Sequence, residues 1–134
     1  MPQSRNPINL AIIVCDSIIE DRESGKKTLV GIFNQLNSKS FPCTHPALSV
    51  FISLTEGQGC YQAQLQCVKS AGDEPILTLE GPVDFQDPKA IVELGFNIRA
   101  MSFPGPGTYE FHFLCDGVLL GQRPFQVRET GQEQ

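Results

Sequence analysis

The residues best suited to chemistry in this sequence are a thiol and an imidazole two positions apart, Cys43 and His45. They lie in a connection over residues 37–46 that prolines interrupt, and a thiol beside a base is the arrangement that nucleophilic catalysis needs. Zinc also accepts both side chains as ligands. The other histidine, His112, follows Glu110 by two positions, which places both on the solvated face of a strand. A hydrolytic triad requires three such groups together, so we expect that the protein is not an enzyme.

Carboxylates recur in the turns between the apolar stretches. If each strand runs antiparallel to the one before it, alternate loops meet at one end of the domain, where their oxygens could hold a hard cation such as calcium. The alternative is that they are ordinary solvated turn residues. The candidate ligands are Asp21, Glu23, Asp84, Asp87 and Asp116, and Glu56 lies in the same set of loops. The glycines of the Pro-Gly-Pro-Gly run over residues 104–107 precede no helix, so they are not a phosphate loop, and no cofactor is predicted.

Composition limits the classes of partner and compartment. The net charge is −5 and no basic stripe is present, which disfavours nucleic acid and anionic membranes as partners. The five cysteines are odd in number and form no Cys-x-x-Cys pair, so free thiols in a reducing cytoplasm are expected. No stretch resembles a signal peptide or is long enough to span a bilayer.

Apolar residues alternate with polar ones along most of the chain, which is typical of half-buried strands. The 12 glycines and 10 prolines favour many short strands joined by turns. We predict an all-β, immunoglobulin-like antiparallel β-sandwich of seven or eight strands in one domain over residues 8–128, after a disordered N-terminus (1–7) and before a polar tail (129–134). The expected strands cover residues 8–19, 28–36, 48–55, 61–67, 76–80, 90–98, 108–114 and 118–127.

The last two of these strands form a hairpin whose register is open to two readings. A two-residue Asp116-Gly117 loop would place Phe125 and Val127 on the polar face of the hairpin. A three-residue loop with a bulge at Gly117 places both with the aromatic face of the preceding strand, so the hydrophobic pattern favours it. In that register Gly121 lies opposite Phe111 and leaves room for its ring. The aromatic face itself consists of Tyr109, Phe111 and Phe113.

Two resemblances follow from these residues. The hairpin, with Tyr109 at its start, resembles the last two strands of immunoglobulin-like sandwiches, in which such a tyrosine forms a corner through its hydroxyl. The whole chain resembles a bacterial family of small stand-alone β-sandwich domains that are uncharacterised. This resemblance implies a cytoplasmic sandwich and carries no assigned activity. The shared features are Cys15-Asp16, Gly31-Ile-Phe33, Phe41-Pro42, Phe103-Pro104, Pro106-Gly107-x-Tyr109 and Asp116-Gly117.

The first strands are apolar on both faces, which requires a second cover. The residues that point outward are Ile13, Phe33 and Phe51. The cover is either a second protein, with a homodimer as one possibility, or the 37–46 connection with Phe41 as its plug. We therefore predict a protein–protein interaction module, with cation or small-ligand binding at the loop carboxylates as the alternative. A thiol enzyme built on Cys43 and His45 is a further alternative.

Overall fold

The computed structural model describes residues 6–70, 72 and 74–130. Throughout these ranges the chain forms strands and no helix, so the described part lacks a helix that is long and apolar enough to cross a membrane. The strands are β1 (Ile8–Glu20), β2 (Lys27–Ile32), β3 (Gln35–Ser38), β4 (Cys43–Thr55), β5 (Gly59–Lys69), β6 (Pro75–Phe85), β7 (Val92–Phe103), β8 (Gly107–Cys115) and β9 (Val118–Glu129).

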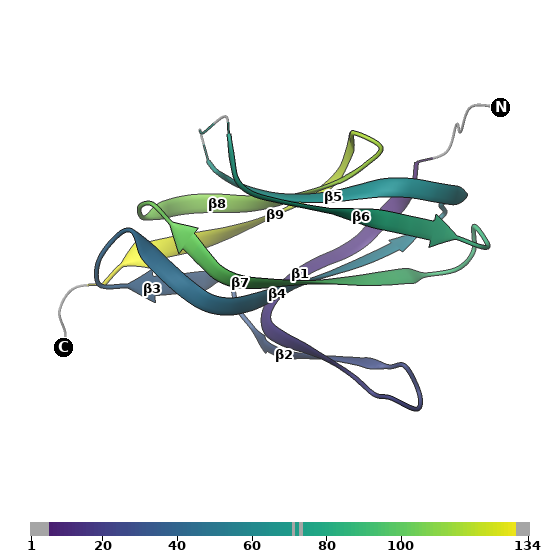
Figure 1. Cartoon of the computed structure of the whole chain (residues 1–134), viewed down its shortest axis with the longest axis horizontal. Coiled ribbons are helices and arrows are strands. Elements are labelled where there is room, and N and C mark those ends of the chain that lie inside the picture. The colour runs from purple at the N-terminus through teal and green to yellow at the C-terminus, as the bar shows by residue number, and fades with distance from the viewer. Residues whose placement is uncertain (1–5, 71, 73, 131–134) are drawn as a thin grey trace.

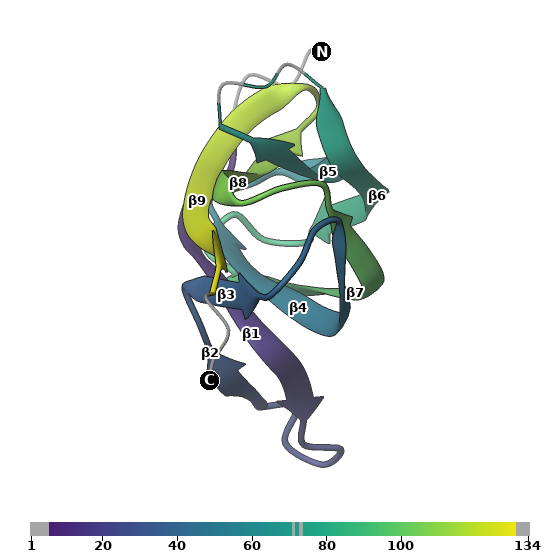
Figure 2. The same cartoon turned by 90° about the vertical axis from the view of Figure 1, so that its left-hand side faces the viewer.

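The strands form two sheets that pack face to face (Figures 1 and 2). One sheet has the order β2-β1-β4-β7 and is antiparallel throughout. The other has the order β3-β9-β8-β5-β6, and its only parallel pair among the described strands is β3 with β9. The predicted all-β sandwich is confirmed, because each sheet buries one face of its alternating strands against the other.

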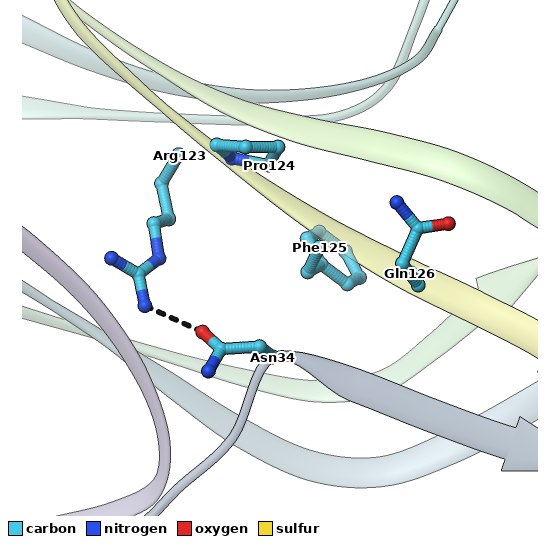
Figure 3. A pocket seen from close by; sticks show the side chains of 5 residues that line it. All are labelled: Asn34, Arg123, Pro124, Phe125 and Gln126. Atoms are coloured by element: carbon cyan, nitrogen blue, oxygen red, sulfur yellow. Dashed lines mark hydrogen bonds between the residues drawn. The ribbon is translucent and has the colours of Figure 1, made fainter.

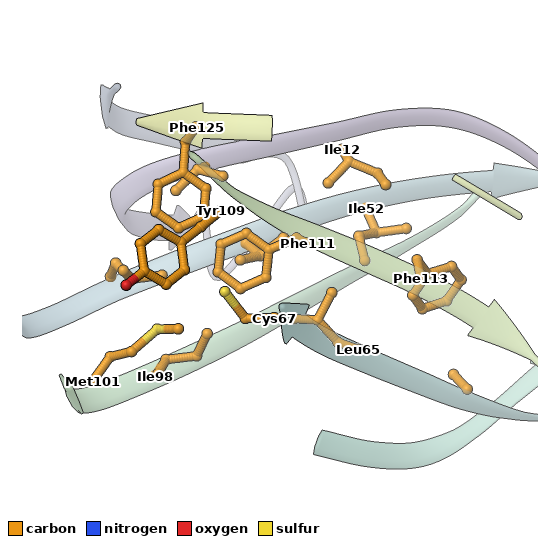
Figure 4. Packing of buried hydrophobic residues seen from close by; sticks show 14 of the residues in the cluster. Ile12, Ile52, Leu65, Cys67, Ile98, Met101, Tyr109, Phe111, Phe113 and Phe125 are labelled. Atoms are coloured by element: carbon orange, nitrogen blue, oxygen red, sulfur yellow. The ribbon is translucent and has the colours of Figure 1, made fainter. Parts of the chain in front are cut away.

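Aromatic side chains of the five-stranded sheet fill the space between the layers (Figure 4). The rings of Phe111 and Phe125 stack with centroids 5.2 Å apart, and Phe103 meets Tyr109 edge to face at 5.0 Å. The opposite sheet contributes Phe103 of β7 and aliphatic residues such as Ile52. Tyr109, Phe111 and Phe113 have no exposed surface, which confirms the aromatic face that the alternation predicted.

The β8–β9 hairpin differs from the prediction in its turn, although Phe125 and Val127 still lie on the expected face. Cys115 pairs with Val118, so the loop has two residues, and Asp116 and Gly117 both have positive φ, as a type I′ turn requires. The register then shifts between Phe113 and Leu114, opposite Leu120, and this bulge in β9 restores the phase of the strand. The predicted three-residue loop was therefore wrong, and Gly121 lies opposite Phe113 instead of Phe111.

Beyond this bulge, β9 points its apolar residues inward as expected. Phe125 and Val127 are buried between the sheets. Leu119, which precedes the bulge, is 44% exposed. The hydroxyl of Tyr109 donates a hydrogen bond to the carbonyl of Gly105 at 2.6 Å. The immunoglobulin-like character of the hairpin stays a prediction.

The predicted strand over residues 28–36 is two strands in different sheets. β2 ends at Ile32, and β3 begins at Gln35 and runs parallel to β9. Gly31 has φ +71°, and the N–H of Phe33 still bonds the carbonyl of Val14 in β1 at 3.0 Å. The chain therefore leaves the four-stranded sheet at Phe33 and Asn34 and crosses to the other layer.

The first strand begins at Ile8 and the last strand ends at Glu129. Pro7 is buried, so the described part of the N-terminal segment is packed against the body. β9 continues to Glu129, which pairs with Ser38, and the N–H of Thr130 bonds the carbonyl of Ser38 at 2.9 Å. The disorder expected of residues 1–5 and the polar tail expected of residues 131–134 lie outside the described residues.

Candidate functional site

Cys43 and His45 lie on a strand and not in a loop. Both belong to β4, where Cys43 pairs with Phe103 and His45 pairs with Met101 of β7. Cys43 packs against the core, and the His45 ring lies 6.0 Å from the ring of Phe33. In the described part of the chain no hydrogen bond joins the thiol to the imidazole, and the surroundings of both are largely apolar. Cys43 and His45 are therefore partly buried residues that pack within the sandwich.

The candidate cation ligands do not come together as one cluster among the described residues. Within residues 6–70, 72 and 74–130, no three histidine, cysteine, aspartate or glutamate side chains come together as a metal site. Asp21 and Glu23 lie in one turn, Asp84 lies on β6, and Asp87 and Asp116 lie in two further loops, so no three of these candidates gather within the described residues.

Three of these aspartates accept hydrogen bonds, Asp21 and Asp87 within their own turns and Asp116 from the neighbouring strand β5. Asp21 accepts the hydroxyl of Ser24 at 2.6 Å, and this bond is the main reason that its pKa is lowered. Asp87 accepts the N–H of Lys89 at 3.0 Å, and Asp116 accepts the N–H of Gln62 at 2.8 Å. Each of these carboxylates therefore faces its own hydrogen-bond donor and not a common centre.

Glu110 and His112 form the pair that the alternation predicted on the outer face of β8. The His112 Nε2 and Glu110 Oε1 atoms are 2.8 Å apart, and both side chains are partly exposed. Within the described residues, no serine, threonine or cysteine side chain forms a hydrogen bond with either residue of this pair. The arrangement is that of a hydrogen-bonded pair on the outer face of a sheet.

The predicted interface residues Ile13 and Phe51 lie side by side on the outer face of the four-stranded sheet. Ile13 pairs with Phe51, and Phe51 pairs with Gly95 of β7. The Cδ1 atom of Ile18 lies 3.1 Å from the position that a Cβ of Gly95 would take. The chain therefore approaches its own outer face with the second half of β1, and Ile13 and Phe51 are half-buried.

The third interface candidate and the predicted plug take other positions. Phe33 is half-buried and packs against the core, and Phe41 does the same. The 37–46 connection therefore does not place Phe41 over Ile13 and Phe51. The segment that approaches these residues is the β1–β2 hairpin.

This hairpin projects from the body of the sandwich (Figures 1 and 2). The pairs between β1 and β4 end at Cys15, and those between β1 and β2 begin there, so the second half of β1 leaves the body together with β2. The inward face of the hairpin is tied to β7 by an ion pair between Lys27 and Glu93 at 3.2 Å. A pocket of about 410 Å³ lies between the hairpin and β7.

The outward face of the hairpin is aliphatic and exposed. Ile19 of β1 and Val30 and Ile32 of β2 have exposed fractions of 55%, 40% and 56%. The register pairs Ser17 with Val30 and Ile19 with Thr28, which places the three aliphatic residues on one face as diagonal neighbours. Ile19, Val30 and Ile32 are hereafter called the hairpin stripe. The sequence prediction missed the stripe because strand periodicity alone did not show that β1 leaves the body after Cys15.

A second pocket, of about 360 Å³, lies where the chain crosses between the sheets (Figure 3). The guanidinium of Arg123 donates a hydrogen bond to the side-chain oxygen of Asn34. The N–H of Gln126 bonds the carbonyl of Asn34 at 3.0 Å. Both bonds attach the crossing segment to β9, so the polar groups of this open pocket hold the fold together.

Comparisons with known proteins place the chain in a family. A search of curated proteins returned no match. Among solved structures, the chain is similar to Pseudomonas fluorescens alkylpurine DNA glycosylase AlkC bound to DNA containing an abasic site analog, with 14% identity and a TM-score of 0.46. That match covers 87% of this chain and 30% of the glycosylase chain, and it carries no inference about function. The model of the Family of unknown function (DUF6941) matches residues 10–128, and the chain therefore belongs to that family.

Proposed function

We propose that this domain is a protein–protein interaction module that binds through the β1–β2 hairpin, and that it is not an enzyme. The observation that carries the proposal is the hairpin stripe, because its three aliphatic side chains are each at least 40% exposed on a segment that projects from the body. Aliphatic residues gathered on one exposed face favour association with another protein.

The position of β2 supports the same role. β2 is the outermost strand of the four-stranded sheet, so one side of its backbone is open to a further strand. A partner that adds a strand at such an edge gains main-chain hydrogen bonds along the edge and side-chain contacts on the neighbouring face. The stripe lies directly beside that edge, since two of its three residues belong to β2.

The cytoplasm is the compartment that fits this proposal. All five cysteines are free thiols, and Cys60 is exposed. Exposed free thiols persist in a reducing compartment, whereas oxidising compartments favour their pairing. The partner is accordingly expected among cytoplasmic proteins, with a second copy of this chain included.

Capture from native lysate with matched variants tests the proposal. The wild type, a Val30→Asp/Ile32→Asp variant and a Thr78→Asp control are each used as bait, since Thr78 is exposed on β6 in the other sheet. We expect a protein that the wild type and the control retain and the double variant loses. If the same proteins remain bound to all three baits, the hairpin is not the binding surface and the proposal fails.

A further inference from the structure

Arg123 stands at a position of β9 that belongs to the core side of the strand. Successive residues of a strand point to opposite faces, and Phe125 and Val127, which share the phase of Arg123, are buried. Arg123 itself is half-buried, whereas its neighbours Gln122 and Pro124 are exposed. The alternation therefore turns this charged side chain toward the space between the two sheets, on the side of β9 that Phe125 occupies (Figure 3).

The guanidinium of Arg123 has a neutral partner and no acidic one. One of its N–H groups bonds the side-chain oxygen of Asn34. Within the described residues, no aspartate or glutamate forms an ion pair or a hydrogen bond with it. An arginine that leaves water is normally paired with an acid, because a desolvated charge without a counter-charge is unfavourable. The remaining N–H groups of the planar fork are therefore available to an acceptor from outside the chain.

The pocket beside Arg123 has the size and the character of a small-ligand site. Its volume is about 360 Å³, and such sites commonly measure roughly 300–1,000 Å³ and are mostly apolar, with a few polar groups. Among the residues that line it, Arg123 alone is charged, and Pro124 and Phe125 contribute apolar surface. A molecule with an apolar body and one negative group is complementary to this lining.

A second donor without an acceptor lies on the same side of the sandwich. The side-chain nitrogen of Asn9 in β1 is buried, and within the described residues it has no hydrogen-bond partner. The Asn9 side chain lies 3.0 Å from the position that a Cβ of Gly121 would take, and Gly121 shares a face of β9 with Arg123. Donors therefore exceed acceptors where β1 faces β9, and this imbalance favours a ligand that brings acceptors.

A single guanidinium in an apolar pocket selects a carboxylate over a phosphate. The planar fork of arginine matches the oxygens of either group through parallel N–H···O bonds. A phosphate group carries close to two negative charges at neutral pH, and proteins usually hold it with a cluster of basic groups. This pocket supplies one positive charge in a chain whose net charge is −5. A carboxylate needs only that one counter-charge.

We propose that this pocket binds a small organic carboxylate, whose oxygens accept hydrogen bonds from the Arg123 guanidinium and whose apolar body lies against Pro124 and Phe125. The bond to Asn34 restrains the guanidinium at the pocket before a ligand arrives, which lowers the entropy cost of binding. None of the residues that line the pocket belongs to the hairpin stripe, so this inference does not rest on the proposed function.

Titration of the isotope-labelled protein with sodium benzoate and with sodium hexanoate, followed by NMR, tests the inference. Benzamide and hexanamide are the matched uncharged probes, and sodium chloride holds the ionic strength constant. We expect a carboxylate to give saturable shifts of the backbone N–H signals of Asn34 and Gln126 and of the Arg123 side chain, and its amide to give far smaller ones. The absence of saturable shifts with both carboxylates overturns the inference, and so do equal shifts with the amides.

Two charge-matched variants assign the binding to Arg123. Arg123→Gln and Arg128→Gln each remove one positive charge from β9, but Arg128 is exposed and stands at the opposite phase of the strand. We expect Arg123→Gln to weaken the binding of the carboxylate by about tenfold or more, because the charge-assisted hydrogen bonds are lost. Arg128→Gln should leave the affinity unchanged. Binding that persists in Arg123→Gln, or that falls equally in both variants, refutes the site.

The spread of the NMR signals verifies that each variant is folded. If Arg123→Gln does not fold, Arg123→Lys takes its place, since it keeps the charge and replaces the planar fork by a single ammonium. Arg123→Lys should also bind the carboxylate more weakly than the wild type, and an unchanged affinity would count against the fork. The comparison of each carboxylate with its amide uses the wild type alone, so it decides the question even if neither variant folds.

Discussion

Cys67 lies between the two sheets, directly opposite Phe111 in the ladder of β5 with β8 (Figure 4). Its side chain has no exposed surface, and burial raises the pKa of its thiol from the ordinary value of 9.0 to about 12. Burial raises the pKa of Cys115 to about 11, with a smaller contribution from Asp116. Both residues act as small apolar side chains, because the core disfavours their thiolate forms.

The raised pKa of Cys67 predicts a loss of stability at alkaline pH. Below pH 9 the thiol is protonated in both the folded and the unfolded chain, so its stabilising contribution is complete. Above pH 9 the unfolded chain releases a proton that the folded chain keeps until about pH 12, so the free energy of unfolding falls across this window. Cys67→Ala should cost about 1–3 kcal/mol at pH 7. This cost should shrink by about 2 kcal/mol by pH 10.5.

Urea unfolding of the wild type and of Cys67→Ala at a series of pH values measures this difference. A difference in the free energy of unfolding that stays constant from pH 7 to pH 10.5 would contradict the raised pKa.

At the scale of elements, β9 pairs with two strands of opposite direction, antiparallel with β8 and parallel with β3. Its first half follows a tight turn out of β8, and its last residues pair with β3 in the parallel direction. Between these parts, Gly121 lies against β1 of the opposite sheet, because a Cβ there would be 3.0 Å from the Asn9 side chain and 3.1 Å from Ile12. The missing side chain of Gly121 therefore sets how closely β1 and β9 approach.

This close approach predicts that Gly121→Ala destabilises the domain by about 1–3 kcal/mol. Asn9 cannot move away freely, because its side-chain nitrogen is buried, and within the described residues it has no hydrogen-bond partner. Gly81 of β6 is the matched control, since a Cβ there would meet no atom within 4 Å. Gly81→Ala should be neutral or slightly stabilising. Chemical denaturation of both variants measures the contrast, and equal effects would contradict the packing at Gly121.

At the scale of the whole molecule, the chain divides into a closed body and a projecting hairpin. The body buries its aromatic core between two sheets, while the hairpin is joined to it through Ile18 and the Lys27–Glu93 ion pair. The carboxylates of Asp21 and Asp87 accept hydrogen bonds within their own turns, and that of Asp116 accepts the N–H of Gln62 on β5. Within the described residues the acidic side chains are therefore spread over strands and turns, and no three of them gather as a metal site.

This distribution predicts that calcium has little effect on stability. A ligand that binds the folded state raises the melting temperature in a saturable way. Because Asp21, Asp84, Asp87 and Asp116 do not converge, we expect the melting temperature to stay unchanged as calcium is raised to millimolar concentration. Differential scanning fluorimetry with magnesium as a control measures this. A saturable rise specific to calcium would show that the carboxylates do gather in solution.

The sequence by itself determined the all-β class and most of the inward residues. Alternation is a local property, because successive side chains of a strand point to opposite faces. The pattern at Tyr109, Phe111 and Phe113 therefore predicted their burial without knowledge of their neighbours. The Asp116-Gly117 pair likewise located the hairpin turn, since both positions require positive φ.

The tertiary structure alone decided which strands pair and where the chain leaves a sheet. The apolar run over residues 28–36 reads as one strand, yet pairing with β1 ends at Ile32 and pairing with β9 begins at Gln35. The bulge opposite Phe113 and Leu114 and the departure of β1 from β4 after Cys15 are decided in the same way. Each depends on contacts between residues far apart in the chain, and side-chain periodicity carries no information about the partner strand. The hairpin stripe results from these contacts, because it lies on the part of β1 and β2 that leaves the body after Cys15.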